Sequence, residues 1–258
     1  GAAQKAGIGL RRAFSEIEKL QVSKKGPGDY VSEADKRSEK VIFEELKSAR
    51  PNYGFLMEES GSINGKDNSN RWIIDPLDGT LNFLHGLPHF SVSIALERDK
   101  ELFAGIVYEP ISDQIFWAEK GKGAWLNGSR IRVSNRSNLA ESVFATGIPF
   151  IGQDGHNLFL TQLEKVMNVS AVVRRFGSAA LDLAYVASGR FEGFWEKNLN
   201  LWDIAGGIVL VREAGGHISN FNQGTELLGS EGIVASNQQI HASLIKILRT
   251  NVEKSLNP

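Results

Sequence analysis

The sequence has no cysteine among its 258 residues. Disulfide bridges and thiolate metal ligands are therefore excluded. No apolar run approaches the ~18 residues that a membrane-spanning helix needs, so we expect no membrane span. The net charge is only −1, from 29 basic and 30 acidic residues. This balance gives no bulk electrostatic attraction to nucleic acid or to an acidic membrane surface.

The remaining composition is that of an ordinary globular protein. The apolar fraction is 41% and the charged fraction 23%, both typical of soluble domains. The length is sufficient for one large domain or for two lobes with cores of their own. No signal-peptide pattern is visible, although the sequence begins at Gly1 rather than Met. We therefore expect a cytoplasmic protein and leave open where the natural chain starts.

The most informative stretch comprises residues 72–83. Its apolar run 72–74 predicts a buried strand, and Pro76, which has no N–H, predicts that strand pairing stops there. Asp78 is a good N-cap for a helix that begins at residues 79–80. Asp75 and Asp78 would then flank a sharp bend beside the N–H groups of a helix start, which suits divalent cations and phosphate. The alternative is a capped strand–turn–helix without chemistry.

The first half of the chain predicts an α+β lobe. We expect helices over residues 8–22 and 32–50 with a turn-rich loop at 24–29 between them, from the spacing of apolar residues. A strand at 53–57 follows, and the polar segment 62–70 predicts a mobile loop. Segments at 90–96, 102–108 and 114–118 and an Asn127-Gly128 hairpin predict an antiparallel meander. This N-terminal lobe is expected to occupy residues 1–138.

The second half alternates strands with helices, which predicts an α/β lobe over residues 139–258. The expected strands lie at residues 143–146, 171–173, 191–195 and 232–235. The expected helices lie at residues 157–167, with Leu160 on the buried side, and at 178–188, 202–214 and from about 237 to 250.

Four acidic residues stand where an element begins or ends: Glu58, Asp75, Asp78 and Asp203. If they converge, they form a cage of hard oxygen ligands without histidine or cysteine, suited to magnesium or manganese. Each acid taken alone is more often a helix cap or a solvated side chain. Spacing does not establish the convergence, because Asp203 belongs to the other lobe.

Residues 72–83 resemble the first signature of the inositol monophosphatase family, a family of magnesium-dependent, lithium-inhibited phosphatases. Residues 202–207 resemble its second signature, Trp-Asp-x-Ala-Ala-Gly, with Gly206 in place of an alanine. Residues 58–60 are similar to its Gly-Glu-Glu-Ser element, with Met57 in place of the glycine. The resemblance covers nearly the whole chain. It implies the layered α-β-α-β-α sandwich, of α+β class, that this family shares with fructose-1,6-bisphosphatase, and it implies a homodimer.

The resemblance also implies the roles of individual residues at a site with two or three Mg²⁺ ions, for which Mn²⁺ is a possible substitute. Glu58, Asp75 and the Leu77 carbonyl would hold the first ion, and Asp75, Asp78 and Asp203 the second. Glu58 and Thr80 would orient the attacking water, and Asp35 would help to place and activate it. Lys24 matches a basic residue near the third metal.

The substrate pocket follows from the same resemblance. Glu196 matches an acid that accepts hydrogen bonds from inositol hydroxyls, a chemically sensible role for a carboxylate beside a polyol. The alternative is an exposed acid before a loop. The full set of expected substrate-binding residues is Asp78, Gly79, Thr80, Gly177, Ser178, Ala179, Glu196 and Asp203.

The predicted activity is hydrolysis of inositol 1-phosphate to myo-inositol and phosphate by a metal-activated water. The Leu81-Asn82-Phe83 ending of the first signature resembles the inositol group more than the nucleotidase group, which tends to have a lysine after the threonine. The alternatives are related phosphatases of fructose 1,6-bisphosphate, adenosine 3′,5′-bisphosphate or histidinol phosphate.

Residues 177–196 look like bacterial members, some of which also bind transcription machinery. The adjacent Arg174 and Arg175 would suit such a partner, or would simply be solvated or interface arginines.

Overall fold

A computed structural model of the chain describes residues 1–16, 22–26, 29–228 and 232–249, and for residues 22–26 and 29–32 it describes the backbone alone. The helices within these ranges are α1 (Ala2–Phe14), α2 (Glu33–Ala49), α3 (Thr80–Leu84), α4 (His156–Met167), α5 (Ala179–Ala187), α6 (Leu201–Glu213), α7 (His241–Leu248) and the 3₁₀ helix η2 (Leu139–Glu141). None of them is both long and apolar enough to cross a membrane.

The larger sheet has eight strands in the order β10-β9-β8-β7-β6-β5-β3-β4. Its neighbouring strands are antiparallel except for β3 and β5, which run parallel. The strands are β3 (Tyr53–Met57), β4 (Gly61–Ile63), β5 (Asp67–Asp78), β6 (Ser91–Arg98), β7 (Glu101–Glu109), β8 (Gln114–Glu119), β9 (Gly123–Leu126) and β10 (Ser129–Ile131). A separate hairpin pairs β1 (Val22–Gly26) with β2 (Asp29–Ser32).

The smaller sheet has five strands in the order β12-β11-β13-β15-β14. β12, β11 and β13 are parallel, whereas β15 runs antiparallel to both of its neighbours. The strands are β11 (Val143–Thr146), β12 (Val172–Arg174), β13 (Gly193–Glu196), β14 (His217–Ser219) and β15 (Ile233–Ser236).

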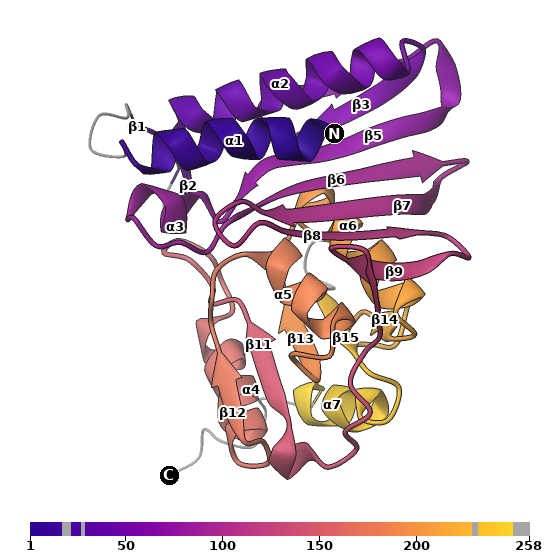
Figure 1. Cartoon of the computed structure of the whole chain (residues 1–258). Helices are drawn as coiled ribbons and strands as arrows, with labels where there is room; N and C mark the ends of the chain where they lie inside the picture. The colour runs from indigo at the N-terminus through magenta and orange to yellow at the C-terminus, as the bar shows by residue number, and fades with distance from the viewer. Residues whose placement is uncertain (17–21, 27–28, 229–231, 250–258) are drawn as a thin grey trace.

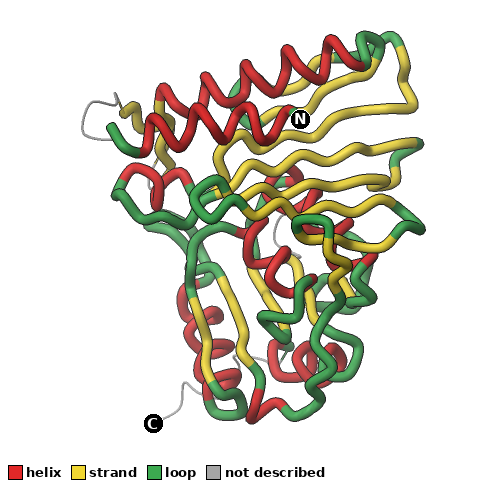
Figure 2. Tube along the Cα trace, viewed as in Figure 1, coloured by secondary structure: helices red, strands yellow, loops and turns green. Residues whose placement is uncertain are grey.

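The elements form five layers, as Figures 1 and 2 show. Helices α1 and α2 cover the outer face of the larger sheet. Helices α5 and α6 lie between the two sheets, and α4 and α7 pack beyond the smaller sheet. The central α5 and α6 are apolar nearly all round, which is typical of helices buried on every side. The predicted α-β-α-β-α sandwich is therefore confirmed.

Several local predictions were wrong for identifiable reasons. Helix α1 begins at Ala2, well before residue 8, because its buried face is built from small residues such as Ala3 and Ala6, which carry a weak hydrophobic signal. Ile8, the first residue of the predicted helix and one of the apolar residues whose spacing predicts it, is 59% exposed. Residues 17–21 of the predicted helix lie outside the described residues. Leu160 on α4 is likewise exposed, at 58%.

The polar segment 62–70 is not a loop. It contains part of the edge strand β4 and the first residues of β5. An edge strand pairs through its backbone and leaves its side chains in water, so its composition looks like that of a loop. The predicted loop at 24–29 likewise contains β1 and the start of β2, and its residues 27–28 lie outside the described residues.

Pro76 does not end the central strand. β5 continues to Asp78, and the pairing with β6 is merely irregular between Asp75 and Asp78. The N-cap of α3 is Gly79 rather than Asp78. The carboxylate of Asp78 is thereby released from capping its own helix and is available to the other half of the molecule.

Candidate active site

The turn at the end of β5 holds two acids in fixed positions. Asp75 is 2% exposed, and its Oδ1 accepts a hydrogen bond from the Leu77 N–H at 3.0 Å. Thr80 Oγ1 lies 2.8 Å from the Leu77 carbonyl oxygen, to which it donates. Gly79 has φ +91°, a conformation that favours glycine, and it lets the chain turn at once into α3. The two acids therefore face the same region from a rigid bend.

Asp78 joins this bend to the second sheet's half of the molecule. Its Oδ2 accepts hydrogen bonds from Ser178 Oγ at 2.5 Å and from the Ala180 N–H at 2.8 Å. Ser178 is also the N-cap of α5, where its side chain accepts from the Leu181 N–H. Because a helix N-terminus favours a negative charge, the start of α5 holds Asp78 in place.

The acids Asp35 and Glu58 approach from two further elements. Asp35 stands in the first turn of α2, and Glu58 directly follows β3. Ligand oxygens of Asp35, Glu58 and Glu59 all lie within 4.8 Å of one another. Asp35 Oδ2 also accepts a hydrogen bond from Thr80 Oγ1 at 3.3 Å. The three residues expected to handle the water, Asp35, Glu58 and Thr80, are thus brought together.

Asp203 completes the cluster from α6. It occupies the N3 position of a capping box, in which its Oδ2 accepts the Asn200 N–H at 2.7 Å. The spacing along the chain does not establish that Asp203 lies near the other acids, but their charges act on it in the folded protein. Burial raises the pKa of Asp203 well above the ordinary value, and the charges of Asp78 and Glu58 raise it further.

The same repulsion acts on the acids of the β5 turn. Burial raises the pKa of Asp75 well above its usual range, and the charges of Glu58, Asp78 and Asp203 add to the effect. Burial also raises the pKa of Asp78 to about 6, against the hydrogen bonds from Ser178 and Ala180 that lower it. A group of buried carboxylates at one place is stable in its ionised form only beside positive charge. All its donors are hard oxygens, so the set fits Mg²⁺ or Mn²⁺.

A cavity of about 550 Å³ opens beside the acids. Glu58, Asp78 and Asp203 line it, and so does Glu196, which stands at the end of β13 in the smaller sheet. Gly147 fits closely against Glu196, since a Cβ at residue 147 would lie 1.8 Å from the Glu196 Oε1. Burial and the charge of Asp78 raise the pKa of Glu196 to about 8, while Arg175 lowers it.

The other residues expected at the site are distributed around this cavity. Gly79, Thr80, Gly177 and Ala179 line it together with the acids named above. Asp35, Asp75, Leu77 and Ser178 are buried and are not part of its lining. The backbone of Lys24 lies in β1, and its side chain is outside the described residues.

Three residues near the cavity were not assigned to the site from the sequence. Arg175 is exposed but lines the cavity. Asn82 Nδ2 donates to the Phe176 carbonyl at 2.6 Å, and so ties α3 to the loop before Gly177. Asp182 is 1% exposed, and burial raises its pKa, with Glu196 adding to that rise. The only available signal was their place inside or next to the family motifs.

This fold and this site define a class of protein. A carboxylate cage next to a polar cavity, inside a layered α+β sandwich, is the arrangement of a metal-dependent phosphatase that hydrolyses phosphate monoesters. The chain belongs to the inositol monophosphatase family, whose model matches residues 1–253.

Individual relatives support the same assignment. An inositol-1-monophosphatase of Mesorhizobium japonicum is 52% identical over 248 residues, which cover 96% of this chain and 93% of that protein. The Nus factor SuhB of Escherichia coli K12 is 40% identical over 255 residues, 99% of this chain and 96% of the relative. A crystal structure of the extragenic suppressor protein suhB of Bartonella henselae matches with a TM-score of 0.95 at 52% identity, covering 97% of this chain and 96% of the other.

Proposed function

We propose that the chain hydrolyses inositol 1-phosphate to myo-inositol and phosphate with Mg²⁺ as its cofactor, two or three ions per site, and with Mn²⁺ as a substitute. The observation that carries the proposal is one cavity lined by the acids Glu58, Asp78 and Asp203 and also by Glu196. The first three would bind the cations, and Glu196 would bind the hydroxyls of the substrate.

The cations would be held by the acids that repel one another in their absence. Glu58, Asp75 and the Leu77 carbonyl would bind one ion, and Asp75, Asp78 and Asp203 the other. When bound, such ions polarise the phosphate, lower the pKa of a bound water and neutralise the leaving oxygen. Asp75 is buried, and the charges of Glu58, Asp78 and Asp203 act on it, so it would need a cation to remain ionised.

The attacking water would be placed by Glu58, Thr80 and Asp35. The Thr80 hydroxyl lies between the Leu77 carbonyl and the Asp35 carboxylate, which fix its orientation. Asp35 is 1% exposed and in reach of Glu58, so it can receive or share the proton of the water. The backbone N–H groups of Gly79 and Thr80 would contact the phosphate.

The polyol would be recognised on the other side of the cavity. Glu196 has two acceptor oxygens for vicinal hydroxyls. Gly177 and Ala179 would border the same position, and Ser178 would act through its hydrogen bond to Asp78. Asp78 and Asp203 would contact the substrate as well as metal. An apolar ring without hydroxyls would leave Glu196 without a partner, so the pocket favours polyols.

A substrate panel tests this function. Metal-stripped protein with added Mg²⁺ is assayed for phosphate release from inositol 1-phosphate, fructose 1,6-bisphosphate, adenosine 3′,5′-bisphosphate and an aryl phosphate. We expect the largest kcat/KM for inositol 1-phosphate. A larger value for either bisphosphate would replace the inositol assignment, and activity unaffected by chelation would reject the metal mechanism.

Further properties of the family belong to the same proposal. We expect a cytoplasmic homodimer inhibited by lithium, with the lobes at residues 1–138 and 139–258 meeting at the site. Light scattering tests the dimer, and lithium titration of the Mg²⁺-activated reaction tests the inhibition. A monomer at micromolar concentration, or turnover insensitive to lithium, would contradict the respective expectation.

A second role rests on relatives that are named as Nus factors. The side chains of Arg174 and Arg175 are exposed, as a binding surface for transcription machinery would require. Since such binding does not need the cations, it would persist in Asp78→Asn and fail in a double Arg174→Ala/Arg175→Ala variant. A binding assay with RNA polymerase and its elongation factors distinguishes these outcomes.

A further inference from the structure

Helix α2 contributes more to the site than Asp35. Asp35, Ser38, Glu39 and Ile42 follow the i, i+3, i+4, i+7 spacing of one helix face, and their exposed fractions are 1%, 3%, 4% and 0%. Three of these four buried residues are polar. A face directed only at an apolar core would not carry a buried carboxylate such as Glu39, because burial of a charge is costly.

Both carboxylate oxygens of Glu39 accept hydrogen bonds from the turn at residues 58–60. Its Oε2 accepts the Glu59 N–H at 2.8 Å, and its Oε1 accepts the hydroxyl of Ser60. That turn follows β3 and carries Glu58. Hydrogen bonds to a charged acceptor are stronger than neutral ones, and two of them fix the turn in direction as well as in position.

Ser38, the preceding residue, holds the second acidic turn. Its Oγ donates to the Pro76 carbonyl oxygen at 2.8 Å, between Asp75 and Asp78. Ser38 and Glu39 of α2 therefore hydrogen-bond to both turns that supply proposed metal ligands, the turn after β3 and the turn at the end of β5. Since Glu39 stands one helical turn after Asp35, the helix also fixes the distance from Asp35 to both turns.

We propose that Glu39 is a positioning residue of the cation site, assisted by Ser38. It acts through the Glu58–Ser60 turn and touches neither the substrate nor the reacting atoms. The inference rests on the proposed function, because it assigns a task to Glu39 only if the acids bind a cation. Outer partners of this kind commonly change metal affinity by ~10–100-fold when they are removed.

Magnesium binding to the phosphate-free protein, measured by calorimetry, tests the proposal without using turnover. Glu39→Ala removes both acceptors, and we expect the Kd for Mg²⁺ to rise by ~10-fold or more. Glu39→Gln keeps an acceptor for the Glu59 N–H and presents an amide to Ser60, so it should restore most of the affinity. The apparent Mg²⁺ activation constant should rise in parallel, with a smaller change in KM for substrate at saturating metal.

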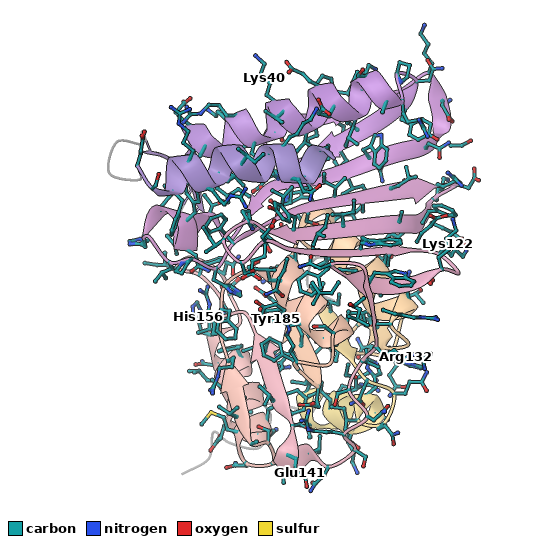
Figure 3. The ribbon with its side chains drawn as sticks, viewed as in Figure 1. Lys40, Lys122, Arg132, Glu141, His156 and Tyr185 are labelled. Carbon is teal, nitrogen blue, oxygen red and sulfur yellow. The ribbon has the colours of Figure 1, made fainter. Side chains whose placement is uncertain are left out.

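Two controls separate positioning from general stability. Ile42→Val alters the same buried face but removes no hydrogen bond to either turn, so it should lower the melting temperature and leave the Kd for Mg²⁺ unchanged. Lys40 points away from the sheet, as Figure 3 shows, and is 74% exposed. Lys40→Ala should change neither quantity.

Ser60→Ala removes the hydrogen bond between Ser60 and Glu39 by changing its exposed partner. This variant tests the proposal even if Glu39→Ala does not fold. We expect it to weaken Mg²⁺ binding, and to add little in the Glu39→Ala background because the two changes break one interaction. Failure of the wild type to bind Mg²⁺ would refute the proposed function. Normal Mg²⁺ affinity in both Glu39→Ala and Ser60→Ala, or an equal loss in Ile42→Val, would refute the positioning role alone.

Discussion

The Glu196→Gln variant distinguishes two effects of Glu196: the destabilisation of the folded protein by its buried charge, and the binding of substrate hydroxyls. In the folded protein, burial and the charge of Asp78 raise the pKa of Glu196 to about 8, with Arg175 acting in the opposite direction. The ordinary value, expected in the unfolded chain, is 4.5. Glutamine keeps the size of the side chain and removes the charge that burial disfavours.

The sign of the effect follows from these two pKa values. The folded protein binds this proton more tightly than the unfolded chain, so between about pH 4.5 and pH 8 the unfolded chain loses it first. Stability therefore falls as the pH rises through this window. At ~1.4 kcal/mol per pKa unit the full difference amounts to ~5 kcal/mol. The carboxylate keeps partial contact with water in the cavity, so we expect ~1–3 kcal/mol at pH 9.

Urea unfolding of the metal-free protein measures this cost. Glu196→Gln should match the wild type near pH 5 and exceed its free energy of unfolding by ~1–3 kcal/mol at pH 9. Glu192→Gln provides a matched control, because Glu192 is also buried but is paired with Arg136 Nη1 at 2.8 Å. Removing one partner of that pair should destabilise the protein. A gain in Glu196→Gln that is the same at every pH would refute the reasoning.

The same variant tests recognition. Above pH 8, where the Glu196 carboxylate is charged, loss of this acceptor should weaken transition-state binding of inositol phosphate by ~1–3 kcal/mol. Turnover of an aryl phosphate, which presents no hydroxyls, should stay nearly unchanged. Equal losses on both substrates would show that Glu196 is structural and would remove the main support for an inositol substrate.

Three other predictions concern the acids and their surroundings. Asp78→Asn should lower turnover on every phosphate ester by orders of magnitude, since a bound metal contributes several kcal/mol to transition-state stabilisation; a substrate-selective loss in steady-state assays would contradict this. Mg²⁺ at 100 times its Kd should stabilise the folded wild type by ~2.7 kcal/mol and so raise its melting temperature. The rise should be smaller in Asp203→Asn. If scanning calorimetry shows no rise at millimolar Mg²⁺, the four acids do not form a cation site. Gly147→Ala places a Cβ 1.8 Å from the present position of Glu196 Oε1, so KM for inositol phosphate should rise by ~10-fold while aryl phosphate hydrolysis persists; an unchanged KM would mean that Glu196 has room to move.

The presence of two acids at a turn after a buried strand could be predicted from the sequence because this feature is local. A buried apolar run, two acids three residues apart and a glycine fix what that stretch can offer, whatever surrounds it. Most strand and helix positions followed for the same reason, since their periodicity is encoded in neighbouring residues. The errors at Ile8 and Leu160 arose because the buried faces of α1 and α4 include small or polar residues, which give a weak hydrophobic pattern. The error at residues 62–70 arose because β4 is an edge strand with exposed side chains.

Only the tertiary structure decided how distant residues share the site. Ser178 and Asp78 are 100 residues apart and hydrogen-bonded, and Asp203 reaches the β5 acids because α6 packs between the two sheets. Nothing in the sequence distinguishes Glu39 from the other polar residues of α2, because its hydrogen bond to the turn after β3 forms only in the folded protein. Such contacts depend on the packing of whole layers, and no spacing along the chain encodes them. The sequence by itself determined which acidic side chains are available, and the packing of the five layers determined which of them come close to one another.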